Sequence, residues 1–204
     1  MGKTSDLYKT ISSPSEEVLY KDRKSKFYGY AFPLQNETEV KPLIQSLRKM
    51  HPSANHVCYA WQLGISDKHY RANDDGEPNN SAGMPIYGQI QAYGVTNVLV
   101  AVVRIFGGSK LGVGGLIQAY KSAAQMALEH ATIVSRTLKV VLRLNFPYAE
   151  LDKVMRLIKK QQLEIISQQM ELECSIQIAV RQNDIDTIES LFGALHKISV
   201  KRSG

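Results

Sequence analysis

The sequence has few of the residues that hold small secreted proteins together. It contains only two cysteines in 204 residues, Cys58 and Cys174, so it is not a disulfide scaffold. Its longest apolar run, Val98–Val103, is far shorter than the roughly 20 residues that a membrane span needs. The first residues lack the apolar core of a secretory signal. These absences predict a reduced, cytoplasmic protein with no membrane partner.

Charge of one sign is also not concentrated anywhere along the chain. Lys and Arg number 25 and Asp and Glu number 19, which gives a net charge of +6 without a dense basic stripe. Hydrophobic residues make up 44% of the chain, an ordinary globular content that argues against disorder. The positive excess permits a polyanionic partner but identifies none, and no motif indicates DNA specificity.

Hydrophobic periodicity divides the chain near residue 136. The first part predicts strands over 17–22, 26–34, 57–63 and 96–106, helices over 38–51, 81–93 and 116–130, and a polar loop over 64–80. The remainder has the order β-α-β-β-α-β, which is typical of a ferredoxin-like arrangement. We therefore expect an α+β protein with two domains, residues 1–136 and 137–204.

The most informative segment is glycine-rich. Five of the nine residues from 107 to 115 are glycine, and they separate an apolar strand from a helix. Backbone N–H groups at such a helix start bind anions, and Arg104 and Lys110 would add charge-assisted contacts to phosphate. The segment matches neither a P-loop nor a dinucleotide fingerprint. The sequence therefore favours equally an anion site and a tight turn, with these candidate glycines: Gly107, Gly108, Gly112, Gly114 and Gly115.

A second polar segment carries three acidic residues, Asp74, Asp75 and Glu77. Their oxygens could bind a hard cation, but the spacing is not that of an EF-hand, so solvated carboxylates are the simpler interpretation. The following helix start, with Ser81 and Gly83, is a second candidate anion site.

His56 precedes Cys58 by two residues on a predicted strand, so both side chains share one face. Metal or nucleophilic chemistry would need further ligands or partners at suitable spacing, and these are missing. We accordingly predict no catalytic residue, no metal and no cofactor, with His56 as an additional candidate beside the acidic loop.

The motifs in their order resemble the IMPACT family, specifically its bacterial YigZ-like members. They are His51-Pro52 with His56-Val-Cys58-Tyr-Ala-Trp61, Asp74-Asp-Gly-Glu-Pro78 with Ser81-Ala-Gly83, and Arg104-Ile-Phe-Gly-Gly108 with Lys110-Leu-Gly-Val-Gly-Gly-Leu116 and Ala119-Tyr120. Two departures stand out. Asn80 occupies a position where the family has glycine, and Lys26 stands where arginine is usual.

The resemblance implies a fold and a class of function. It implies an N-terminal domain with a left-handed βαβ crossover, like elongation factor G domain IV, and a ferredoxin-like C-terminal domain, like domain V of that factor. Related folds bind RNA, ribosomes or nucleoside phosphates. Eukaryotic relatives regulate translation by engaging the activation machinery of a stress-responsive initiation-factor kinase.

Three functions remain open at this point. The favoured one is a non-enzymatic RNA- or ribosome-associated protein that regulates translation, with RNA, the ribosome or a protein of translation control as its partner. A phosphate- or nucleotide-binding enzyme or regulator could use the same Gly107–Gly115 segment, with the acidic loop holding a cation. A protein–protein adaptor could dock through its C-terminal half.

Overall fold

The structure, a computed structural model, describes residues 6–203. These residues form two compact units, each with its own sheet and helices. One unit is residues 8–136, and the other joins residues 6 and 7 to residues 137–203. The predicted two-domain α+β class is confirmed. Residues 1–5 and 204 of the expected domains lie outside the described residues. None of the helices within residues 6–203 is long and apolar enough to cross a membrane.

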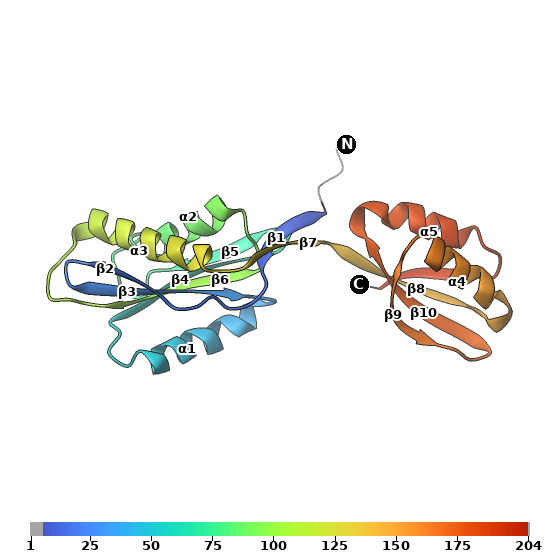
Figure 1. Ribbon diagram of the computed structural model, residues 1–204, viewed down its shortest axis with the longest axis horizontal. Coiled ribbons are helices and arrows are strands. Elements are labelled where there is room, and N and C mark those ends of the chain that lie inside the picture. Colours follow the sequence, from blue (N-terminus) through green and yellow to red (C-terminus); the bar gives the residue numbers. More distant parts are fainter. Residues whose placement is uncertain (1–5, 204) are drawn as a thin grey trace. The chain divides into compact units, whose positions relative to one another are not determined.

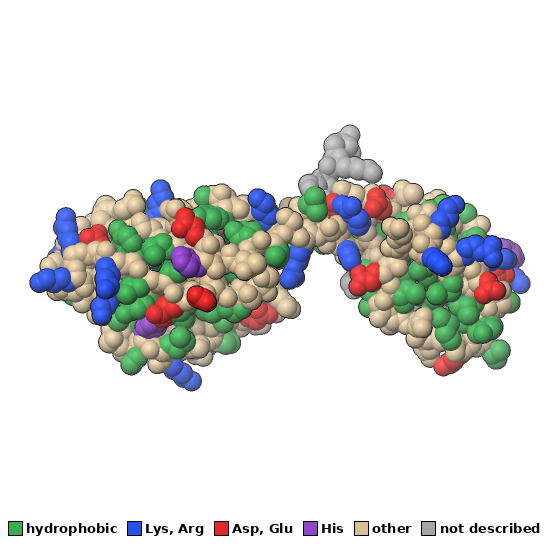
Figure 2. Space-filling model, in the orientation of Figure 1, with side chains coloured by type: hydrophobic (Ala, Val, Ile, Leu, Met, Phe, Trp, Pro, Cys, Tyr) green, Lys and Arg blue, Asp and Glu red, His purple; other side chains and the backbone are tan. Residues whose placement is uncertain are grey.

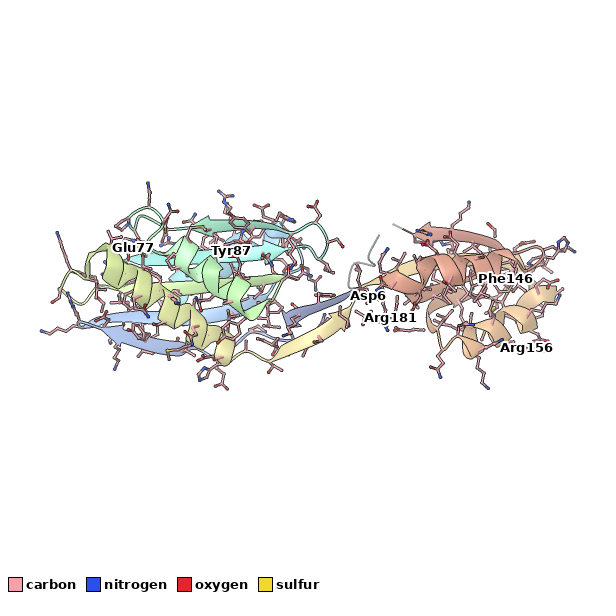
Figure 3. All side chains as sticks on the ribbon, turned by 90° about the horizontal axis from the view of Figure 1, so that it is seen from above. Asp6, Glu77, Tyr87, Phe146, Arg156 and Arg181 are labelled. Carbon is pink, nitrogen blue, oxygen red and sulfur yellow. The ribbon has the colours of Figure 1, made fainter. Side chains whose placement is uncertain are left out.

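Asp6 explains why the start of the described chain groups with the second unit instead of the first. Its backbone oxygen accepts a hydrogen bond of 2.7 Å from the Leu138 N–H. Its buried carboxylate accepts two bonds of 3.2 Å from the Arg181 guanidinium. Figure 3 shows the two labelled side chains next to each other. The expected boundary therefore needs a correction, because it places Asp6 in the first domain.

The first unit is built on a five-stranded sheet in which neighbouring strands are antiparallel. The strand order is β2 (Val18–Asp22), β3 (Ser25–Pro33), β6 (Val98–Ile105), β4 (His56–Leu63) and β5 (His69–Asn73). Strand β6 is central and almost wholly buried, as expected for an apolar, β-branched segment covered on both faces.

Helices cover both faces of this sheet. Helix α1 (Val40–Met50), which follows the short 3-10 helix η1 (Glu37–Glu39), lies on one face, and α2 (Gly83–Tyr93) and α3 (Gly112–Glu129) lie on the other (Figure 1). Alternate residues of β6 serve the two faces. Leu99, Ala101 and Val103 pack on the α1 side, and Val98, Val100 and Val102 pack on the side of α2 and α3.

The sheet contains two βαβ crossovers of opposite hand. Both β3–α1–β4 and β5–α2–β6 join parallel strands that are separated by one other strand. The two crossovers differ in three respects. Strand β5 runs antiparallel to β3, the path from β5 to β6 crosses the sheet in the direction opposite to the path from β3 to β4, and α2 lies on the face opposite to α1. Three reversals together change the hand, so one of the two is left-handed, which is rare. The likeness to elongation factor G domain IV stays a prediction.

The structure corrects the expected elements in three places. Strand β5 lies inside the predicted polar loop over 64–80; it is an edge strand without a buried face, so no apolar alternation marks it. Strands β1 (Leu7–Ile11) and β7 (Ile133–Thr137) form an additional two-stranded sheet. Helix α3 begins at Gly112 and not at Leu116, so the last part of the glycine-rich segment is helical.

The second unit has a single antiparallel sheet of order β11-β8-β10-β9. Chain order and sheet order together are those of the ferredoxin-like βαββαβ arrangement. Its core is formed by alternate residues of β8 and β10 with residues of α4 and α5. The elements are β8 (Lys139–Pro147), η2 (Tyr148–Glu150), α4 (Leu151–Lys160), β9 (Glu164–Gln169), β10 (Glu173–Arg181), η3 (Gln182–Asp184), α5 (Ile185–Gly193) and β11 (Ser199–Ser203).

Candidate functional site

A cavity of about 430 Å³ opens in the first unit where β6 ends and α3 begins. We call it the Arg104 pocket. Its walls include Glu77 and His56 near Arg104, and Phe106, Lys110 and the first turn of α3 opposite them. Figure 3 shows the labelled Glu77 beside the first turn of α3. The structure thus brings together candidates from all three motifs that the sequence singled out.

Strand register places Arg104 in one row with a residue on each neighbouring strand. Arg104 on β6 pairs with Phe27 on β3 and with His56 on β4. Arg104 continues the alternation of Val98, Val100 and Val102, so it points to the face that α2 and α3 cover. A cationic side chain therefore lies at the end of an apolar strand, under the start of α3.

Arg104 is almost fully buried, with 6% of its surface exposed. Its Nη1 donates a hydrogen bond of 2.6 Å to Glu77 Oε1. Its guanidinium lies 5.5 Å from the ring centres of both Phe27 and Phe106. Its Nε, however, is buried without a hydrogen-bond acceptor. A buried donor without an acceptor is unfavourable and rare, so a ligand oxygen is a physically reasonable partner.

Glu77 neutralises part of this charge. Its Oε1 also accepts a hydrogen bond of 2.8 Å from the Tyr120 hydroxyl, and His56 Nε2 lies 3.9 Å away. Burial, followed by the neighbouring Cys58 and Glu77, raises the pKa of Tyr120 well above its usual range. Tyr120 therefore stays protonated and acts as a donor to the carboxylate. Tyr120 is not among the site residues predicted from the sequence, although it belongs to the third motif of the family resemblance.

The orientation of His56 follows from its backbone contact. Its Nδ1 lies 2.8 Å from the Asp75 carbonyl oxygen, which can only accept, so Nδ1 carries the hydrogen. In the neutral ring Nε2 is then an acceptor. Gly76 adjoins the same imidazole: a Cβ built on it would lie 3.6 Å from Nδ1.

The first turn of α3 provides the second group of donors. Leu111 at the N-cap makes no side-chain capping bond, and the first turn carries no acidic residue. The first N–H groups of a helix have no partner within the helix and lie at the positive end of its dipole. Gly112 begins the helix with φ +75°, and Gly114 and Gly115 continue it. Lys110 precedes this turn and is exposed.

Gly107 and Gly108 do not line the cavity, and their role is to allow the tight turn after β6. A Cβ on Gly107 would lie 2.0 Å from the Lys24 carbonyl carbon, so only glycine lets the two backbones approach. Gly108 adopts φ +87°, which favours glycine. The tight-turn interpretation therefore applies to Gly107 and Gly108, and the anion-site interpretation stays a prediction for the end of the segment.

The acidic loop is held by its own backbone contacts. Asp74 Oδ1 accepts hydrogen bonds from the N–H groups of Ala82 and Gly83, at 2.9 and 2.8 Å, and Oδ2 accepts from Asn80. The second predicted anion site, at Ser81 and Gly83, is therefore filled by a carboxylate of the chain itself. That candidate is corrected, because an external anion would have to displace Asp74.

Asp75 faces a different set of donors. It accepts hydrogen bonds from Arg48 Nη2 and from the Val57 N–H, the latter at 2.6 Å. The three acidic side chains thus diverge to separate partners, and within residues 6–203 no cluster of three or more His, Cys, Asp or Glu could hold a metal ion. Asn80, which replaces the family glycine, has φ +60°, a conformation that asparagine tolerates.

Cys58 lies on β4, two residues after His56, and is buried. Its Sγ donates a hydrogen bond of 3.0 Å to the Asp74 carbonyl oxygen. Burial is the main cause that raises the pKa of its thiol far above the usual range.

On the face of the molecule that Figure 2 shows, Lys and Arg are spread over both units with acidic side chains between them. We take the Arg104 pocket as the candidate site.

Comparisons with known proteins agree with this reading of the motifs. Residues 23–128 match the Impact N-terminal domain. YvyE of Bacillus subtilis is 34% identical over 72% of this chain and 67% of its own length, and YigZ of Escherichia coli is 30% identical over 80% and 81%. A solved structure of a hypothetical protein, 23% identical, covers 97% of this chain and 98% of its own with a TM-score of 0.68. The chain therefore belongs to the IMPACT family, as a YigZ-like bacterial member.

Proposed function

We propose that this protein associates with RNA or the ribosome in the regulation of translation, and that the Arg104 pocket binds an RNA phosphate. One observation carries the proposal. The guanidinium of Arg104 is buried with its Nε unsatisfied, beside a helix start that has no side-chain cap. A phosphate in the pocket would accept from the N–H groups of the helix start and would lie beside Arg104 and Lys110, which both line the cavity.

The charge of the pocket suits an anion, either a phosphodiester or a terminal phosphate. Glu77 offsets the charge of Arg104 through their 2.6 Å contact. Lys110 and the helix dipole, which is equivalent to about half a charge, remain to face a ligand. A phosphodiester carries one negative charge, whereas a terminal phosphate carries about −1.5 to −2 near neutral pH. The charge left in the pocket is about one and a half units, so charge alone does not distinguish an RNA backbone from a phosphorylated metabolite.

The regulatory part of the proposal is supported by the family. The resemblance described above implies that eukaryotic members regulate translation, and the rat Protein IMPACT is 32% identical to this chain over 54% of it and 38% of its own length. The net charge of +6 is compatible with a polyanionic partner. A non-enzymatic role is part of the proposal, and the burial of the Cys58 thiol is compatible with it.

One observation favours a second function. At about 430 Å³ the pocket lies within the size range of small-molecule sites, and Leu111, Val113 and Leu116 give it an apolar wall. A phosphorylated small molecule is therefore the alternative ligand. A thermal-shift series with nucleotides and sugar phosphates distinguishes it, because a specific ligand raises the unfolding temperature with its concentration.

The test of RNA binding compares two charge reversals in the same helix region. Lys110→Glu changes the pocket, and Lys121→Glu makes the same change at an exposed position of α3. We expect Lys110→Glu to weaken RNA retention and ribosome co-sedimentation at low salt. The slope of log binding constant against log salt concentration should become less steep by about one unit, which corresponds to the loss of about one phosphate contact. Lys121→Glu should have little effect. A protein that binds neither RNA nor ribosomes at low salt would exclude the proposal.

A further inference from the structure

Phe106 is a large aromatic side chain that remains 42% exposed at the rim of the Arg104 pocket. It follows β6 directly, and its N–H donates a hydrogen bond of 2.8 Å to Asn55 Oδ1. The Arg104 guanidinium lies 5.5 Å from the ring centre. The backbone contact and the cation thus fix where the ring lies, while part of the ring stays open to solvent.

Further apolar side chains lie exposed at the same end of the unit. Val113, which lines the pocket, is 53% exposed, and Ile117 is exposed one helical turn later on α3. Exposed apolar groups beside a buried, incompletely paired cation match a ligand that has a flat apolar part next to an anionic part. A nucleotide has this composition, because its base is flat and its phosphate is charged.

We infer that the ligand is single-stranded RNA, with one base stacked on Phe106 while an adjoining phosphate enters the Arg104 pocket. This inference rests on the proposed function and specifies its ligand. In a duplex the bases are paired and stacked on one another, so an aromatic ring has no free base face to contact. Stacking on an aromatic side chain is tolerant of sequence, so binding should show little base preference.

The experiment compares two labelled oligomers of equal length and charge by fluorescence anisotropy: oligouridylate and an abasic phosphodiester. Phe106→Ala should weaken binding of oligouridylate by at least about fivefold, the low end of what one base stack contributes, and leave the abasic oligomer unchanged. Phe106→Tyr should restore oligouridylate binding, because it restores a stacking surface. Tyr148→Ala removes an exposed aromatic from the other unit and is the control.

The outcomes separate the inference from the proposal on which it depends. If both oligomers bind and Phe106→Ala weakens them equally or not at all, the stacking inference is wrong while phosphate binding stands. Tighter binding of a duplex than of the single strand would also overturn it. If neither oligomer binds, the proposed function fails. Fluorescence of the single Trp61, which is buried in the same unit as Phe106, verifies that this unit is folded in the Phe106 variants.

Discussion

Replacing Glu77 by Gln isolates the role of the buried charge pair. The change keeps the shape of the side chain and an oxygen that can accept from Tyr120, but it removes the negative charge next to Arg104. Arg104 then keeps its charge in a position where 6% of its surface is exposed. The substitution therefore changes the electrostatics of the site and leaves no packing void where the side chain was.

The expected loss of stability is large. Removing one partner of a buried ion pair typically costs about 3–5 kcal/mol, because the other charge stays buried and uncompensated. This is a large fraction of the roughly 5–15 kcal/mol by which a domain is stable. With a urea dependence of about 1–3 kcal/mol per molar, the unfolding midpoint should fall by at least about 1 M.

Urea unfolding followed by tryptophan fluorescence measures this loss in the correct unit. Trp61 is the only tryptophan and is 3% exposed within residues 8–136, so its signal reports the unfolding of that unit. Glu37→Gln is the matched control: it removes the same group from a solvent-exposed pair with Arg71 in that unit. Such exposed pairs contribute about 0–1 kcal/mol, so the control midpoint should change little.

RNA affinity provides a second measurement on Glu77→Gln, and it should change in the direction opposite to the stability. Without the carboxylate, the pocket of the folded protein is more positive, so RNA affinity at low salt should rise although stability falls. General damage to the unit would lower both. A midpoint shift no larger than that of Glu37→Gln would refute the idea that Glu77 compensates a buried Arg104.

Two further predictions concern packing and the buried thiol. Gly107→Ala should destabilise the first unit by more than about 1 kcal/mol, because the new Cβ would meet the Lys24 backbone. Gly114→Ala should instead stabilise α3 by up to about 1 kcal/mol, because its new Cβ meets nothing within 4 Å. Thermal unfolding of the two variants measures this difference in stability. Because burial raises the pKa of Cys58, a thiol reagent should not label it in native protein between pH 7 and 9, and should label it after denaturation. Rapid labelling of native Cys58 in that range would contradict its burial.

The sequence predicted the segments whose burial leaves a pattern. Strand β6 and the alternation of β8 and β10 were readable because their apolar residues must face a core. Strands β1, β5 and β7 were missed because they have at most a narrow buried face, and their pairing depends on strands distant in sequence.

The candidate site was predictable in composition but not in assembly. Arg104, Lys110 and the glycines were identified from the residue types that bind anions, and the structure places Arg104, Lys110 and Gly112 around one cavity. That Asp74 fills the start of α2, and that Glu77 reaches Arg104, depends on long-range packing that no local pattern encodes. The role of Phe106 required its exposure, which only the fold defines.

The pairing of Asp6 with Arg181 has a consequence for biosynthesis. The two residues are separated by 175 positions, so the second unit combines a piece of chain made before residues 8–136 with a piece made after them. Asp6 therefore cannot reach its partner until residues 8–136 and the segment up to Arg181 have been translated. Trimming the chain to begin at Tyr8 would consequently weaken the unit at the opposite end of the sequence.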